Sequence, residues 1–286
     1  MNFSAGLLAA VQFTRPRNCL LTAVSVWVGA VTSTQAHTTA AVGFAALGAA
    51  AIAAAGNGMN DVIDLPMDRR NRPDRPLPSG RLAAGSALAI SAFLGATGLA
   101  LAFVAGIVPG LIAFGVLMGL ALYNWFLKRT GLPGNLLVSL IAASTFPYGA
   151  VTAGNWGNWW IPAIFATLYH VGREIVKGVE DMEGDRLAGI RTLALACGAR
   201  FACRTATCLF GLVGLLALWP AIFGIYGLGY LLPVLVLDLF LVFRLPRLWR
   251  GFSPADRRFS PELLVGMALG LLAIVLGELL DPRWAI

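Results

Sequence analysis

The chain has 286 residues, of which 58% are hydrophobic and only 12% are charged. Soluble domains contain about 45–50% apolar and about 25% charged residues, so the composition excludes a soluble globular protein and a disordered one. The net charge is +7, but the basic residues lie between apolar runs, which argues against a nucleic-acid partner. The cysteines form no CxxC pair, so we predict neither a disulfide framework nor a zinc site.

Nine apolar runs approach the length of about 20 residues that a membrane-spanning helix needs. They cover roughly residues 18–35, 39–59, 84–105, 107–127, 134–153, 159–176, 205–224, 227–243 and 262–280. We therefore expect an all-α polytopic membrane protein in which residues 1–286 form a single membrane domain. No charged leader and no clear cleavage site accompany the first run, so it is predicted to be retained.

The positions of Lys and Arg predict the orientation in the membrane. If the N-terminus is cytoplasmic and all nine runs cross the bilayer, every Lys and Arg except Arg283 falls on the cytoplasmic side. Cytoplasmic loops carry the excess of basic residues in membrane proteins. The pattern thus predicts a multi-pass protein of the cell membrane with a cytoplasmic N-terminus, and one missed helix would scramble it.

Acidic residues gather where the second predicted span ends. Asn60, Asp64 and Asp68 are four residues apart, so on a helix they share one face, and Asp61 lies beside them. Because like charges at this spacing repel each other, a purely structural helix would not carry this stripe without a bound cation. Oxygen ligands of this kind are those that Mg²⁺ prefers, so we predict that these four residues bind the metal.

Arginines follow in a loop that is stiffened by Pro73, Pro76 and Pro78. The guanidinium groups of Arg72 and Arg75 suit phosphate oxygens, and we predict that both bind a phosphate group. The alternative interpretation is ordinary positive charge on the cytoplasmic side.

A second polar stripe closes the sixth predicted span. Tyr169, Arg173, Lys177, Asp181 and Asp185 are each four residues apart, although successive steps drift by about 40° around the helix. Two cations precede two carboxylates, as expected of a site that holds an anion and the metal that bridges it. We predict metal binding by the two aspartates and anion binding by Arg173 and Lys177; a salt-bridge ladder within the helix is the alternative.

Four other polar residues belong to the spans or their ends. Tyr123 and Lys128 lie at the cytoplasmic end of the fourth span, where they either face the same anion or serve as an interfacial tyrosine and a snorkelling lysine. His170 points away from the second stripe. Asp238, inside the eighth span, is either a buried hydrogen-bonded acid or the wall of a polar cavity.

The two acidic groups, about 120 residues apart, are predicted to face the same side of the membrane. Mg²⁺ held between them would bind a diphosphate, and the apolar part of that ligand would lie in the helix bundle. A prenyl diphosphate has this shape. Metal and cations would stabilise the leaving diphosphate as the allylic C–O bond breaks, and the apolar pocket would keep water from the carbocation.

At these motifs the sequence resembles the UbiA-type intramembrane prenyltransferases. The matching segments are Asn60-x3-Asp64-x3-Asp68 with residues 71–80, Lys177-x3-Asp181-x3-Asp185 with residues 189–192, and residues 123–135. The resemblance covers nearly the whole chain. It implies nine transmembrane helices around a central lipid-open cavity, cytoplasmic cap segments over the site, and two Mg²⁺.

The resemblance also suggests a role for each matching residue. Catalytic roles fall to Asp64, Asp68, Asp181, Asp185 and Lys177. Metal binding falls to Asn60, Asp61, Asp64, Asp68, Asp181 and Asp185. Diphosphate binding falls to Asn60, Arg72, Arg75, Tyr123, Lys128 and Arg173.

The residues from Arg173 to Asp185 are most similar to the digeranylgeranylglyceryl phosphate synthase-like members of that family. This similarity implies transfer of geranylgeranyl from geranylgeranyl diphosphate to a hydroxyl of geranylgeranylglyceryl phosphate or a similar lipid. The alternatives are a diterpene cyclase and an enzyme with an aromatic, quinone or chlorophyll-type acceptor. A transporter, the non-enzyme alternative, would place its acids near the bilayer midplane, whereas these lie at one face beside arginines.

Overall fold

The computed structural model describes residues 3–32, 40–154, 156–252 and 259–280, and over these ranges the chain is helical, with no strand. Arg257, Arg258 and Arg283, which entered the orientation argument, lie outside the described residues. The elements are α1 (Phe3–Phe13), α2 (Pro16–Val31), α3 (Ala40–Ile63), α4 (Leu65–Asn71), α5 (Ala84–Ala105), α6 (Ile107–Trp125), the 3-10 turn η1 (Leu127–Thr130), α7 (Leu132–Ala143), α8 (Thr145–Thr152), α9 (Trp160–Glu180), α10 (Met182–Leu187), α11 (Leu193–Cys197), α12 (Ala199–Ile222), α13 (Leu228–Arg250) and α14 (Phe259–Leu280).

Seven segments of the described chain are long and apolar enough to cross a membrane: α3, α5, α6, α7 with α8, α12, α13 and α14. The expected polytopic helical architecture is therefore confirmed. Of the other two predicted spans, α2 has only 16 residues, and α9 carries the charged side chains of Arg173, Glu174 and Lys177. Outward-facing side chains such as Ile107, Leu215 and Phe243 are more than 70% exposed, which suits lipid rather than water.

The fifth predicted span is bent instead of straight, because α7 and α8 meet at Ser144. The hydroxyls of Ser144 and Thr145 donate hydrogen bonds back to the carbonyls of Ile141 and Ala142. Pro147 has no N–H to donate to the preceding turn. Back-bonded hydroxyls and a proline are known causes of helix bends, and the bend turns α8 against α2.

Helices α2 and α8 touch through their backbones at two glycines. A Cβ placed on Gly149 would lie 1.9 Å from the carbonyl oxygen of Val26, and one placed on Gly29 would lie 2.1 Å from that of Phe146. Small residues permit such close approach between membrane helices. This contact fixes α2, which forms one wall of the cavity described below.

Because no flexible group can move aside at this contact, we expect Gly149→Ala to lower the free energy of unfolding by about 1–3 kcal/mol, the usual cost of overpacking. Gly43→Ala is the matched control, since a Cβ at Gly43 meets nothing within 4 Å. Thermal unfolding in detergent, followed for both variants, tests this. Equal midpoints for Gly149→Ala and Gly43→Ala would contradict the packing account.

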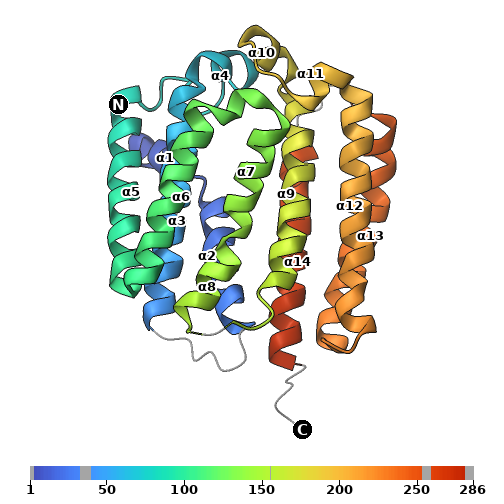
Figure 1. The fold of residues 1–286 in the computed structure, drawn as a ribbon. Helices are drawn as coiled ribbons and strands as arrows, with labels where there is room; N and C mark the ends of the chain where they lie inside the picture. The colour runs from blue at the N-terminus through green and yellow to red at the C-terminus, as the bar shows by residue number, and fades with distance from the viewer. Residues whose placement is uncertain (1–2, 33–39, 155, 253–258, 281–286) are drawn as a thin grey trace.

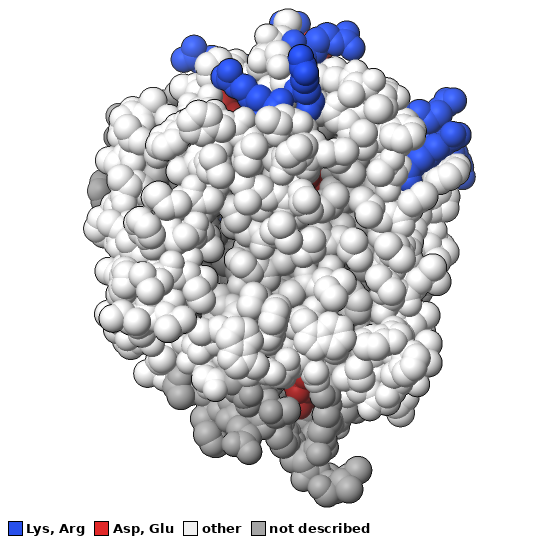
Figure 2. Space-filling model, viewed as in Figure 1, with Lys and Arg blue, Asp and Glu red and all other residues white. Residues whose placement is uncertain are grey.

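The short helices α4, α10 and α11 lie together at one end of the bundle (Figure 1). On the face drawn in Figure 2, the Lys and Arg side chains gather toward this same end, while the rest of that face is almost without charge. Both acidic motifs lead into these short helices, α3 into α4 and α9 into α10. The fold thus brings the two motifs to one end of the molecule.

Candidate active site

The first acidic motif bends at its middle aspartate. The predicted continuous stripe is interrupted because α3 ends at Ile63 and α4 begins at Leu65, with Asp64 between them. Pro66, in the first turn of α4, cannot donate a hydrogen bond to the preceding helical turn. The amides of Asp64 and Asp68 still donate to the carbonyls of Asn60 and Asp64, at 2.9 and 2.8 Å. The three side chains therefore stay close to one face.

Each aspartate of this motif is buried and contacts a cation. Asp64 pairs with Lys128, whose Nζ also donates to Oδ1 of Asn60 at 2.7 Å. Asp61 pairs with Arg15 and with Arg75, the latter at 3.1 Å. Arg75 Nη1 lies 2.6 Å from Asp68 as well. These contacts place Asn60, Lys128 and Arg75 in one cluster with the three aspartates.

The second acidic motif also has an aspartate at the break between two helices. Asp181 lies between the end of α9 at Glu180 and the start of α10 at Met182. Its carboxylate accepts two hydrogen bonds from Arg72 Nη2, at 2.8 and 2.9 Å. The intrahelical ladder considered above, Arg173 or Lys177 with Asp181, is therefore replaced by a pair that joins the two motifs.

Helices α4 and α10 also meet directly. A Cβ on Gly184 would lie 2.0 Å from Nδ2 of Asn71, which is itself buried. At the surface, Arg70 pairs with Glu183 at 3.0 Å, but an exposed pair of this kind contributes little to stability. The glycine at position 184 therefore permits the approach that holds Asp181 and Asp185 against the first motif.

Several of these carboxylates are poorly compensated in the absence of a further cation. Burial, together with the charges of Asp181 and Asp64, raises the pKa of Asp185 to about 7. Burial also raises the pKa of Asp68, although Arg75 opposes that change. Oδ1 of Asp64 is buried and accepts no hydrogen bond from the described residues. Such groups are stabilised when a cation binds beside them.

The carboxylate oxygens of the two acidic motifs are suitable ligands for Mg²⁺, although these side chains contact Arg and Lys in the structure. In the part of the chain that the structure covers, no three His, Cys, Asp or Glu side chains are arranged to hold a metal ion. A cation bound beside the unpartnered Oδ1 of Asp64 and beside Asp185, whose pKa is raised, would nevertheless compensate both groups. Carboxylate oxygens are the ligands that Mg²⁺ prefers.

A cavity of about 240 Å³ begins beside this cluster and extends into the bundle. Asn60, Arg15 and Lys177 line its polar end, and apolar side chains such as Ile52, Val116, Leu120, Val138 and Ile141 line the remainder. A ligand with a charged head and a long apolar tail fits this division.

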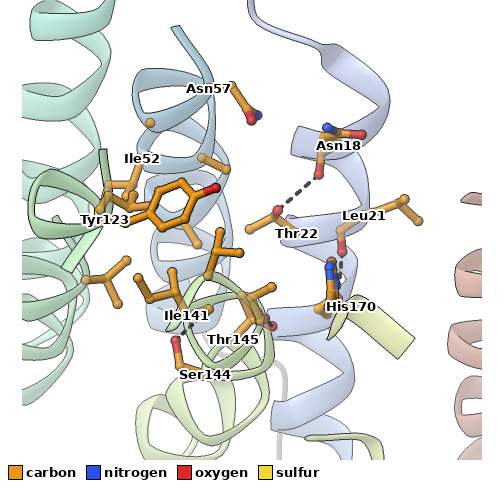
Figure 3. A pocket seen from close by; sticks show the side chains of 18 of the residues that line it. Asn18, Leu21, Thr22, Ile52, Asn57, Tyr123, Ile141, Ser144, Thr145 and His170 are labelled. Carbon is orange, nitrogen blue, oxygen red and sulfur yellow. Dashed lines mark hydrogen bonds between the residues drawn. The ribbon is translucent and has the colours of Figure 1, made fainter. Parts of the chain in front are cut away.

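Tyr123 enters the cavity from α6, with its hydroxyl directed toward the side of α2 where Asn18 and Thr22 lie (Figure 3). Of the two positions that the sequence left open for Tyr123, the structure places it inside the cavity and not at the membrane interface. His170 lies across the cavity from it, beside Leu21 (Figure 3).

Arg173 and Lys177, which the sequence analysis expected to bind an anion, lie on the cavity side of α9. Both face the cavity, but their anionic partner is Glu174, which lies between them on α9. Lys177 Nζ lies 2.7 Å from the Glu174 carboxylate and Arg173 lies 3.8 Å from it. Neither forms an ion pair with Asp181, because their carboxylate partner is Glu174 rather than an aspartate of the two motifs.

Sequence reasoning missed several residues of the site. In the sequence Arg15 indicates only the orientation in the membrane, but in the structure its side chain donates hydrogen bonds to Asp61 and Asn57 and lines the cavity. It is also the one non-glycine residue with positive φ, 54°, among those described, and strain of this kind concentrates at functional sites. Tyr148 and Asn124 line the cavity with buried, unpartnered oxygens. Isolated polar residues in apolar runs were the available signal.

Curated relatives match nearly the full length of the chain. The digeranylgeranylglyceryl phosphate synthase of Hyperthermus butylicus is 34% identical over 95% of this chain and 97% of its own length. That of Ignicoccus hospitalis is 35% identical over 99% of this chain and 95% of its own.

Solved structures share the fold. A structure from work on digeranylgeranylglyceryl phosphate synthase in membranes superposes with a TM-score of 0.70, at 29% identity, over 96% of this chain and 98% of that one. An apo UbiA homologue from Aeropyrum pernix gives 0.74 at 20% identity, over 92% and 97%. A UbiA homologue from Archaeoglobus fulgidus bound to GPP and Mg²⁺ gives 0.67 at 18%, over 94% and 98%.

The family assignment rests on most of the chain. The model of the UbiA prenyltransferase family matches residues 20–272, which include both acidic motifs and most of the residues that line the cavity. With relatives above 30% identity over almost the entire chain, the conclusion follows directly. This chain is a member of the UbiA prenyltransferase family.

Proposed function

We propose that the protein transfers a geranylgeranyl group from geranylgeranyl diphosphate to a hydroxyl of geranylgeranylglyceryl phosphate or a closely similar lipid. The observation that carries this proposal is the meeting of two acidic motifs, joined by Arg72 and Asp181, at the polar end of a cavity that is otherwise apolar. The names of the full-length relatives support the acceptor. The GPP and Mg²⁺ bound to the Archaeoglobus fulgidus homologue support the donor and the metal.

In this proposal Asp64, Asp68, Asp181 and Asp185, with Asn60 and Asp61, hold two Mg²⁺. Bound Mg²⁺ would supply positive charge that stabilises the departing diphosphate. Arg72, Arg75, Lys128 and Lys177, with the hydroxyl of Tyr123, bind diphosphate oxygens when the aspartates turn to the metal. Arg72, Arg75 and Lys128 are each paired with an aspartate of the two motifs, and Lys177 is paired with Glu174, so each cation would exchange its carboxylate partner for an oxygen of the diphosphate.

The reaction is an alkyl transfer. The bond between C1 of the prenyl chain and the diphosphate oxygen breaks, and its electron pair leaves with the diphosphate. The oxygen of the acceptor hydroxyl then forms a bond to the allylic carbon, and the hydroxyl proton passes to an oxygen of the released diphosphate. The apolar walls of the cavity exclude water from the cation between these events.

We also propose that nine segments cross the bilayer, including α2 and α9. The protein then sits in the cell membrane with the N-terminus and the short helices α4, α10 and α11 in the cytoplasm. The gathering of Lys and Arg at the end that carries these short helices supports this orientation (Figure 2). The charges on α9 face the cavity rather than lipid, which is how a spanning helix tolerates them.

The test uses purified protein, Mg²⁺ and geranylgeranyl diphosphate, with and without geranylgeranylglyceryl phosphate. We expect diphosphate release and an ether-linked product only when the acceptor is present. A cyclic hydrocarbon formed from the donor alone would make the protein a cyclase. Product formation with only an aromatic, quinone or chlorophyll-type acceptor would likewise overturn the proposed acceptor.

A further inference from the structure

A second group of cations faces the cavity from the side of α2 and α9. Arg15 and Arg173 both line it, with side chains 24% and 14% exposed. The two guanidinium groups are close enough to interact electrostatically. Lys177 lies on the same helix, and Glu174 is the carboxylate that Arg173 and Lys177 share. Arg15 is paired with Asp61, whereas Arg173 and Lys177 have only the single carboxylate of Glu174 between them, so one of these two positive charges is not balanced.

Arg173 is the least satisfied of these cations. Its Nε is buried and bonds to none of the described residues, and its ion pair with Glu174 is long, at 3.8 Å. A buried guanidinium without hydrogen-bond acceptors is costly. Its planar set of N–H donors is suited to the oxygens of a phosphate group. The geometry therefore points to an anion that binds here.

A second, apolar cavity of about 80 Å³ continues from the first. The two share Ser25, Ala142, His170 and Met267 as lining residues. Side chains such as Phe146, Phe165, Tyr230, Leu237 and Ile274 enclose the second cavity.

One face of α9 connects the second cavity with the unsatisfied cation. Pro162 and Ala166 line the second cavity, His170 lines both, and Arg173 lines the first. These positions are three or four residues apart and therefore follow one helix face. An elongated ligand along this face would have its apolar chain beside Ala166 and its charged group beside Arg173.

We propose that this face is the acceptor subsite, which binds an anionic lipid separately from the prenyl diphosphate. Arg173 and Arg15 bind its phosphate, the hydroxyl-bearing part lies beside His170, and the apolar chain enters the second cavity. The proposal rests on the proposed function, because it identifies the cation pair with the acceptor of that reaction. It differs from the sequence prediction for Arg173, which assigned this residue to the diphosphate.

The number of cations around the cavity favours an anionic acceptor over a cyclase or a neutral acceptor. The diphosphate has Arg72, Arg75 and Lys128 beside the two acidic motifs. A cyclase, or an enzyme with a neutral aromatic acceptor, would need no further anion site. Two anionic ligands that are bound together require two groups of cations, since each phosphate must be neutralised in a low-dielectric cavity.

The kinetic test uses the full-length protein with Arg173→Gln, Arg173→Lys and the control Arg244→Gln. Arg244 also pairs with a glutamate, Glu262 at 3.3 Å, and lines neither cavity. We expect Arg173→Gln to raise the KM for geranylgeranylglyceryl phosphate about 10- to 100-fold, the size of a lost charge-assisted hydrogen bond, with the KM for geranylgeranyl diphosphate unchanged. Arg173→Lys should recover part of the loss, and Arg244→Gln should behave as wild type.

The same lipid without its phosphate tests the recognised group. Wild type should use geranylgeranylglycerol as poorly as Arg173→Gln uses the phosphorylated lipid, and the substitution should have no further effect on it. Ala166→Leu, which fills part of the second cavity, should raise the KM for the acceptor and leave the KM for the donor unchanged. Equal increases in the KM of donor and acceptor, or an unchanged acceptor KM in Arg173→Gln, would overturn the proposal.

Binding of the acceptor alone separates this proposal from the proposed function. Geranylgeranylglyceryl phosphate should raise the thermal unfolding temperature of wild type and Arg244→Gln, but not that of Arg173→Gln, in the absence of donor and Mg²⁺. If wild type shows this stabilisation and yet forms no ether product, the transfer reaction is wrong and the anion subsite stands. If wild type forms the product and all three proteins are stabilised equally, the subsite is wrong and the reaction stands.

Discussion

Asp64→Ala and Asp181→Ala are each expected to lower prenyl-transfer turnover by about three orders of magnitude or more, because each removes a carboxylate from the proposed metal site, and metal stabilisation of a leaving group contributes several kcal/mol. Asp64 lies at the bend between α3 and α4, with one buried oxygen that has no partner. Asp181 holds the corresponding place between α9 and α10. The measurement is the rate of diphosphate release at saturating donor and acceptor.

Two controls keep this prediction specific. Asp74→Ala removes an exposed aspartate of the same segment and should retain wild-type turnover. Asp64→Asn keeps the shape of the side chain beside Lys128 but not its charge, and should be nearly as inactive as Asp64→Ala. Both Asp64 variants should still insert in the membrane and elute as folded protein. Wild-type turnover in Asp64→Ala or Asp181→Ala would refute the metal site.

Removal of Mg²⁺ should have an effect of similar size. With EDTA in excess, we expect no measurable diphosphate release, and added Mg²⁺ should restore the full rate. The physical reason is that Arg72, Arg75 and Lys128 are committed to aspartates in the cluster. Without a metal to take over those carboxylates, the cations are not free for the diphosphate.

The effect of Mg²⁺ on the thermal stability of the protein can be measured in the same samples. Since burial disfavours the charged forms of Asp68 and Asp185, binding of Mg²⁺ beside them should raise the unfolding temperature of wild type. Asp185→Asn should reduce that increase. Undiminished turnover in EDTA would show that the cations alone suffice and that the aspartates have another role.

Hydropathy predicted the long helices well because every spanning segment must satisfy its backbone hydrogen bonds within itself in lipid, and a helix does so. The predicted run 84–105 is α5, and the run 107–127 is α6 with a slightly earlier end. The hydropathy pattern did not predict the positions at which a helix bends, because the residues on both sides of a bend remain apolar. Neither the break at Asp64 nor the one at Ser144 alters the periodicity, since both depend on a nearby proline or on back-bonded hydroxyls.

Partner choice within the site could not be predicted from spacing. The alternative interpretation of the stripe on α9 paired Arg173 or Lys177 with Asp181, but both cations pair with Glu174, which lies between them in the sequence. Asp181 instead bonds Arg72, which is 109 residues away. Likewise, Arg15 reaches Asp61 across 46 residues. Such contacts arise from helix packing, and no local sequence pattern encodes them.

The most direct test of the account is a crystal structure of the protein with Mn²⁺ in place of Mg²⁺ and a thio analogue of geranylgeranyl diphosphate that cannot release its diphosphate. The anomalous signal of Mn²⁺ locates the metal independently of the surrounding density. We predict signal between Asp64 and Asp68 on one side and Asp181 and Asp185 on the other, with Arg72 turned from Asp181 to the diphosphate. Bound analogue with no metal between the two motifs would contradict the account.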